Sequence, residues 1–186
     1  MMDLKNYCER AYQVATYNGF YREYKSPQHY ICLIISELME AVQAHRHNKF
    51  INIGPNDVVD YLEKVKDDDD FYRLYDYLIH NTYEDELADV CIRIFSFARY
   101  MGFTLQTVGD EVLVTLGIFN RENPEFTELI LQIVDILRNY PPAASLDYAL
   151  SATVLLPIRY ETRLDRIIPL KLRYNKLRGY LHGAVY

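Results

Sequence analysis

Apolar residues recur at spacings of three and four along most of the chain, which is the pattern of amphipathic α-helices. Leu4, Tyr7, Cys8 and Ala11 follow this spacing near the start of the sequence, and Gly19 is placed to end that helix. No stretch shows the sustained alternation of apolar and polar residues that is typical of a half-buried β-strand. The chain is therefore predicted to be all-α.

Capping residues and prolines set the expected limits of the later helices. Ser26 and Pro27 are typical of a helix start, and Thr82 is placed to cap the helix that follows it. Pro157 is expected to bend or break a helix. The acidic run at residues 67–70 is interpreted as a solvated loop, because neighbouring like charges repel. After the first helix, the expected helices span about residues 27–48, 58–65, 71–79, 126–138 and 145–160, with one more that begins after Thr82 and one that runs from Ile167 to Leu181.

Composition narrows the class of protein. A chain of 186 residues with 50% hydrophobic content can build one sizeable core, so we expect a single all-α domain over residues 1–186. The formal net charge of −6 argues against a nucleic-acid partner, which would require a basic surface. Neither a signal peptide nor an apolar run of about 18 residues is present, so we expect a cytoplasmic protein without a membrane span.

Two pairs of acidic residues lie within otherwise apolar helical segments. Glu37 and Glu40 form the first pair, and Glu86 and Asp89 form the second. Residues three apart share one side of a helix, so each pair can direct both carboxylates toward a common ion. Glu37 falls within the apolar arc of its helix, where an ionised carboxylate is costly unless it is paired or bound to a metal. The two pairs therefore predict a Mg²⁺ site, because Mg²⁺ prefers oxygen ligands.

An ordinary explanation of the same residues stays open. Glu-x-x-Glu is common in helices, and Glu37 could simply border solvent and form an ion pair. Glu86, Asp89, Arg93 and Ser96 form the polar stripe that any amphipathic helix would have. Asp89 and Arg93 are also spaced for a salt bridge within one helix. Spacing alone does not decide between a polar stripe and a metal site.

The last predicted helix carries a row of polar residues beside its apolar seam. In an unbroken helix four of them align on one side, and they are Lys171, Asn175, Arg178 and His182. Such donors suit polyphosphate oxygens, and Tyr174 beside them could stack on a base. Gly179 could interrupt the helix and displace His182. The alternative is a solvated basic helix end.

Three segments resemble, in the same order, the signature of the MazG-like all-α nucleoside triphosphate pyrophosphohydrolases. They are Ser36-Glu-Leu-Met-Glu-Ala-Val42, Glu84-Asp-Glu-Leu-Ala-Asp-Val-Cys-Ile-Arg93 and Lys171-Leu-Arg-Tyr-Asn-Lys-Leu-Arg-Gly-Tyr-Leu-His-Gly183. The resemblance implies the helical bundle of that family and a homodimer or homotetramer. It also implies Mg²⁺-dependent hydrolysis of an NTP or dNTP between the α and β phosphates, which gives the monophosphate and pyrophosphate.

The resemblance further implies a role for each matching residue. The expected metal ligands and catalytic residues are Glu37, Glu40, Glu86 and Asp89. The expected substrate-binding residues are Lys171, Tyr174, Asn175, Arg178 and His182. Among these, Lys171, Asn175 and Arg178 are expected to grip the phosphates.

The sequence departs from the family pattern at several places. Gly179 stands where the family has proline, and Ala184 stands where it usually has lysine. Residues 111–163 look like extra helices inserted before the C-terminal helix. These departures keep a second interpretation open, a non-catalytic helical module that binds a nucleotide or a protein and retains the bundle. A di-iron protein of the helical-bundle type fits less well, because that class usually has Glu-x-x-His pairs.

Overall fold

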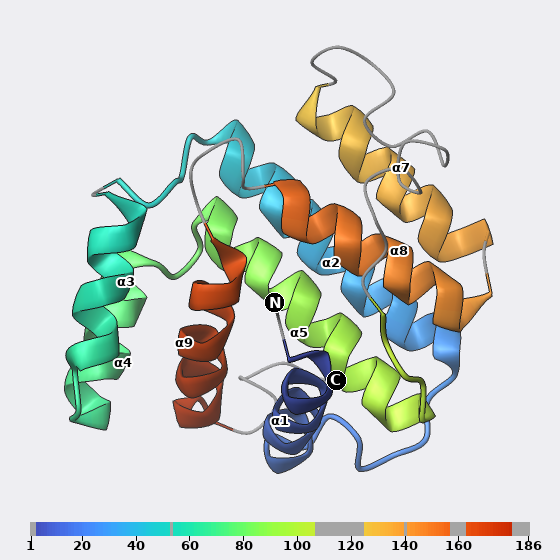
Figure 1. Ribbon diagram of the computed structural model, residues 1–186, viewed down its shortest axis with the longest axis horizontal. Coiled ribbons are helices and arrows are strands. Elements are labelled where there is room, and N and C mark those ends of the chain that lie inside the picture. The colour runs from blue at the N-terminus through green and yellow to red at the C-terminus, as the bar shows by residue number, and fades with distance from the viewer. Residues whose placement is uncertain (1–2, 53, 107–124, 140, 157–162, 180–186) are drawn as a thin grey trace.

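The structure, a computed structural model, describes residues 3–52, 54–106, 125–139, 141–156 and 163–179 (Figure 1). This part of the chain forms helices and no strand, which confirms the all-α prediction. The helices are α1 (Leu4–Tyr17), α2 (Pro27–Arg46), α3 (Pro55–Lys64), α4 (Asp68–Leu78), α5 (Tyr83–Met101), α7 (Phe126–Asn139), α8 (Pro142–Leu155) and α9 (Leu164–Leu177).

Helix α5 lies at the centre of the molecule. It packs against α2, α1, α9 and α8 (Figure 1). Nearly every residue from Tyr83 to Ala98 is buried as a result, including the acidic residues Glu84, Asp85 and Glu86. Helices α2 and α5 run antiparallel beside each other, as Figure 1 shows. Polar side chains on the facing sides of these two helices are therefore held inside the protein, where they need partners.

Helices α7 and α8 belong to the same hydrophobic core as α5. They pack on each other, while α8 also contacts α5 and α7 contacts α2. Leu129, Ile133, Leu146 and Leu150 contribute fully buried side chains. The described part of the segment predicted as an insertion thus covers α2 and α5 on the side away from α9.

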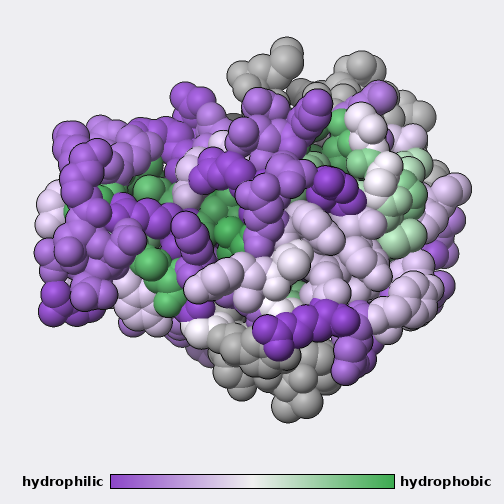
Figure 2. Space-filling view, turned by 90° about the horizontal axis from the view of Figure 1, so that it is seen from below, coloured by the Kyte–Doolittle hydropathy of each residue, from purple (hydrophilic) through white to green (hydrophobic). Residues whose placement is uncertain are grey.

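Helix α9 is tied to α3 and α4 by ion pairs at the surface. Arg166 binds Asp60 and Glu63 on α3, and Arg173 binds Asp68 at the start of α4. Figure 2 shows hydrophilic residues gathered over the end of the molecule that α3 and α4 form, with apolar residues visible between them. Among the described helices, none is both long enough and apolar enough to cross a membrane.

Several predicted helix ends are confirmed. Gly19, just after α1, has a φ of 95°, a left-handed conformation that favours glycine. Pro27 is the first residue of α2, although the Ser26 side chain makes no capping hydrogen bond. The Thr82 hydroxyl accepts a hydrogen bond from the backbone N–H of Asp85 at 3.3 Å, as a capping residue should.

The prediction of a loop at residues 67–70 is wrong. Asp67 caps α4, and its side chain accepts a hydrogen bond from the backbone N–H of Asp70 at 2.9 Å. Residues 68–70 form the first helical turn. Negative charge is favourable there because the helix dipole places partial positive charge at the N-terminus, and solvent exposure weakens the mutual repulsion of the aspartates.

The end of α9 also differs from the prediction. The helix stops at Leu177, and Arg178 has an extended conformation with φ −75° and ψ 153°. Arg178 therefore leaves the helix just before Gly179, so the predicted row of residues does not continue on one helical face. Pro157, Leu181 and His182 lie outside the described residues.

Pro169 lies inside α9, where it lacks the N–H that would bind the carbonyl of Asp165. The Tyr7 hydroxyl on α1 donates a hydrogen bond to that carbonyl at 3.1 Å. A side chain from another helix thus supplies the donor that proline removes, and this contact fixes α9 against α1.

Candidate metal centre

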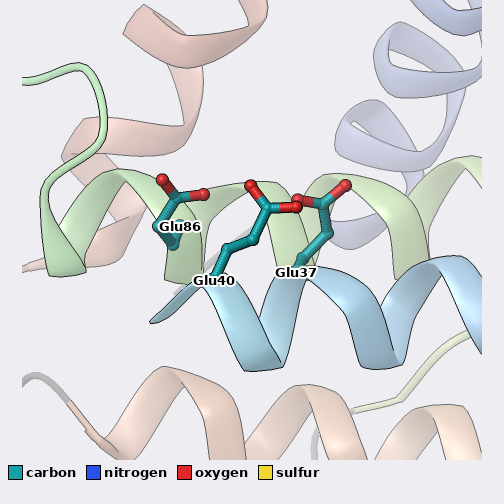
Figure 3. Close-up of side chains that lie close together, drawn as sticks. All are labelled: Glu37, Glu40 and Glu86. Atoms are coloured by element: carbon teal, nitrogen blue, oxygen red, sulfur yellow. The ribbon is translucent and has the colours of Figure 1, made fainter. Parts of the chain in front are cut away.

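Three glutamates converge between α2 and α5. Carboxylate oxygens of Glu37 and Glu40, on α2, and of Glu86, on α5, lie within 4.8 Å of one another. Figure 3 shows the three side chains extending toward the same side of the helix pair. Glu37 and Glu86 are 8% and 6% exposed, while Glu40 is exposed. The structure therefore brings together three of the four carboxylates that the sequence singled out.

Two of these glutamates are held in an environment that disfavours their negative charge. Burial, followed by repulsion from Asp89 and Asp85, raises the pKa of Glu86 to about 9. Burial and repulsion from Asp89 raise the pKa of Glu37 to about 7, although Arg93 partly offsets both effects. Within the described residues the side chain of Glu86 makes no hydrogen bond. A bound divalent cation would favour the ionised form of both glutamates, because it would place positive charge beside them.

Asp89, the fourth predicted ligand, is bound by side chains of α9. Its carboxylate accepts from Lys171 Nζ at 2.8 Å and from Asn175 Nδ2 at 3.2 Å. Burial raises the pKa of Asp89, but the attraction and hydrogen bonds of these two residues outweigh that effect and hold the pKa below its ordinary value. Asp89 lines the same cavity as the glutamates, and it stays ionised there through partners from the protein.

Asp85, which the sequence did not single out as a site residue, is completely buried and fully hydrogen-bonded. Its carboxylate accepts from Lys171 Nζ at 2.7 Å, from the Tyr75 hydroxyl at 2.7 Å and from the backbone N–H of Asn81 at 3.0 Å. These three donors satisfy a charge that has no access to solvent. The run Glu84-Asp-Glu86 could have revealed Asp85 from the sequence, because three consecutive acidic residues in a buried helix cannot all face solvent, and a buried one needs partners.

Lys171 was expected to bind phosphate, but its ammonium binds Asp85 and Asp89 instead. Its side chain is 1% exposed, and Asp85 and Asp89 hold the pKa of its ammonium above the ordinary value despite the opposing effect of burial. Asn175, one helical turn on, binds Asp89 through its Nδ2 atom, while its Oδ1 atom is buried without a hydrogen-bond partner in the part of the chain that the structure describes. An unsatisfied acceptor in the wall of a polar cavity is rare in proteins and marks a place where a ligand or water can bind.

The remaining predicted substrate-binding residues lie at different places. Tyr174 packs between aromatic rings, with Tyr72 at 4.9 Å and Tyr75 at 4.6 Å, and its hydroxyl donates to Asp76 at 2.6 Å. It does not line the cavity. Arg178 does line the cavity, from the end of α9. The prediction for His182 falls outside the described residues.

Arg93 pairs with Glu37 across the helix interface. Its Nε atom donates to Glu37 Oε1 at 2.9 Å, and no ion pair joins it to Asp89 within the described residues. The within-helix salt bridge that the spacing allowed is therefore replaced by a contact between α5 and α2. Sequence spacing could not reveal this, because the contact depends on how the two helices pack.

The glutamates lie in the wall of a cavity of about 360 Å³, within the range of small-molecule sites. One part of its wall is charged, with the carboxylates described above and Lys171, Arg93 and Arg178. The other part is contributed mainly by Ala11, Val14 and Ala15 of α1, with Phe20 just beyond that helix. A ligand that fills the cavity would need an anionic or cation-binding portion and a less polar portion.

No family model, curated protein or solved structure matches the chain. The resemblance of the three sequence motifs therefore stays a prediction. The cavity itself indicates the chemistry of the site, because its wall holds hard oxygen ligands, too little positive charge to balance them and a group of apolar side chains.

Proposed function

We propose that the chain is a MazG-like, Mg²⁺-dependent nucleoside triphosphate pyrophosphohydrolase that cleaves an NTP or dNTP to the monophosphate and pyrophosphate. The observation that carries the proposal is the convergence of Glu37, Glu40 and Glu86 within 4.8 Å in a cavity that also has an apolar wall. The agreement of these positions with the motif that resembles the family adds to it.

The donor set fits Mg²⁺. All three converging groups are carboxylates, which are hard ligands, and within the described residues neither histidine nor cysteine joins their cluster. The raised pKa values of Glu37 and Glu86 indicate a site that lacks positive charge. A bound Mg²⁺ would supply that charge, polarise the phosphate and lower the pKa of a water molecule.

The other residues of the cavity wall would position the carboxylates and bind the substrate. Lys171 and Asn175 fix Asp89 in its ionised form at the cavity wall. Arg93 fixes the orientation of Glu37. The side chains of α1 offer an apolar surface suited to a base or sugar, while the charged wall suits the phosphates.

The experiment is a measurement of pyrophosphate release from a panel of common NTPs and dNTPs in the presence of Mg²⁺. Glu37→Gln and Glu86→Gln should each lower kcat/KM at least 100-fold, because each removes an ionisable ligand. Glu23→Gln serves as a matched control, since Glu23 is an exposed glutamate that forms an ion pair with Lys25 and does not line the cavity. An inert wild-type protein on the whole panel would refute the proposal, and so would full activity of both site variants.

A second candidate is a non-catalytic module that binds a nucleotide without cleaving it. This function is favoured by the ion pairs of Lys171 with Asp85 and Asp89, because they occupy a side chain that was expected to bind phosphate. Mg²⁺-dependent binding of a nonhydrolysable triphosphate, with no pyrophosphate released from any NTP, would decide for this function. The homodimer or homotetramer stays part of the proposal, and light scattering of the purified protein would test it.

A further inference from the structure

Arg93 has one side of its guanidinium bound and the other side open. The Nε atom donates to Glu37 Oε1 at 2.9 Å, whereas Nη1 and Nη2 make no hydrogen bond within the described residues. The side chain is 26% exposed and lines the cavity. Its two terminal amino groups are thus available to a ligand in the cavity.

The plane of this guanidinium is held in place by two contacts. Glu37 fixes its Nε edge, and the Phe20 ring lies against the group, with 4.6 Å from Cζ to the ring centroid. An arginine whose orientation is already fixed loses little conformational freedom when it binds. Its Nη1 and Nη2 groups form a planar pair of donors, which matches the spacing of two oxygens on a phosphate.

The other two cations of the described cavity wall are less suited to this task. Lys171 is almost completely buried and donates to Asp85 and Asp89. Arg178 follows the last turn of α9, with its guanidinium 5.8 Å from the Tyr174 ring centroid. Only Arg93 contacts one of the converging glutamates directly within the described residues.

We propose that Arg93 is a phosphate-binding residue, whose Nη1 and Nη2 groups bind two oxygens of a polyphosphate while its Nε group positions Glu37 for the metal. The substrate named here depends on the proposed function. The binding of a polyphosphate anion beside the glutamates does not depend on turnover, so it can be tested by itself.

The test is calorimetric titration of inorganic tripolyphosphate with Mg²⁺ into the wild type, Arg93→Gln and Arg93→Lys. We expect affinity to fall at least 20-fold in Arg93→Gln and about 5- to 20-fold in Arg93→Lys, which keeps the charge but loses the paired donors. Mn²⁺ binding without the anion should weaken less than tripolyphosphate binding in Arg93→Lys, because the lysine ammonium keeps a positive charge beside Glu37. Arg99→Gln is the matched control, because Arg99 also binds a glutamate through Nε and lies over a tyrosine ring, but outside the cavity.

A double variant separates the two roles of Arg93. In the Glu37→Gln background, Arg93→Gln should still weaken tripolyphosphate binding, whereas a residue acting only through Glu37 would have no further effect there. Absence of tripolyphosphate binding by the wild type, or equal binding by all Arg93 variants, would overturn the inference. A protein that binds tripolyphosphate through Arg93 yet releases no pyrophosphate from any NTP would uphold the inference and refute the proposed function.

Discussion

Replacing Glu86 by glutamine should make the metal-free protein more stable while it removes a ligand of the proposed metal. The Glu86 side chain is buried without a hydrogen bond among the described residues, and its pKa is raised from 4.5 to about 9. At pH 7 the folded protein therefore holds a proton on Glu86 that the unfolded chain releases. Folding then becomes less favourable as the pH rises from about 4.5 toward 9. Glutamine has no proton to lose, so the variant should escape this penalty.

The size of the effect follows from the same values. A pH of 7 lies about 2.5 units above the ordinary pKa of 4.5, and about 1.4 kcal/mol per unit gives roughly 3.5 kcal/mol. Water in the cavity screens part of it, so we expect a gain of about 1 to 3 kcal/mol. For a chain of this length such a gain raises Tm by roughly 3 to 10 °C.

Urea unfolding at pH 5, 7 and 8.5 without divalent ions measures the difference. It should be close to zero at pH 5 and should grow with pH, whereas Glu23→Gln should show no such trend. Addition of Mg²⁺ should stabilise the wild type, by about 2.7 kcal/mol at 100 times its Kd, and should stabilise Glu86→Gln much less. A variant that is less stable than wild type at pH 7, or a difference that does not change with pH, would refute the reasoning.

Three further results are expected. Lys171→Met should lower the free energy of unfolding by about 3 to 5 kcal/mol in urea titrations, because it leaves the buried Asp85 and the partly buried Asp89 without their cation. A loss below about 1 kcal/mol would contradict the pairing of Lys171 with these two aspartates. Tyr7→Phe should cost about 1 kcal/mol, since it removes the donor to the Asp165 carbonyl, and unchanged stability would mean that this hydrogen bond is not formed in solution. Divalent-ion binding at pH 7 should release protons from Glu86 and Glu37, as titrations in buffers of different ionisation enthalpy would reveal, and buffer-independent heats would argue against the raised pKa values.

Local features of the sequence were enough to predict much of the helical framework. The spacing of apolar residues predicted α1, α2 and α7, and single capping residues such as Pro27 and Thr82 located helix starts. These signals act over one or two helical turns, so they do not depend on the rest of the fold. The acidic residues at 67–70 were misjudged because repulsion was weighed without the helix dipole that offsets it.

The candidate site could be predicted only in part. The positions of Glu37, Glu40 and Glu86 on their helices were available from spacing, and their convergence followed once α2 and α5 packed side by side. The partners of Lys171 and Arg93 were not available, because each lies on another helix. A sequence signal did exist for Lys171, which stands among buried apolar residues of α9, where a cation needs buried carboxylates.

The same imbalance of charge that weakens the fold also makes the cavity selective for a cation. Within the described residues, five carboxylates line it against three cations; the carboxylates are Glu37, Glu40, Asp85, Glu86 and Asp89, and the cations are Arg93, Lys171 and Arg178. The excess of two negative charges equals the charge of one divalent ion. Without that ion the protein retains protons on buried glutamates, as their raised pKa values indicate. Because α5 is enclosed by four other helices, water cannot fully screen this excess of negative charge. Binding of one divalent cation would replace the protons on the glutamates with a positive charge that the carboxylates share.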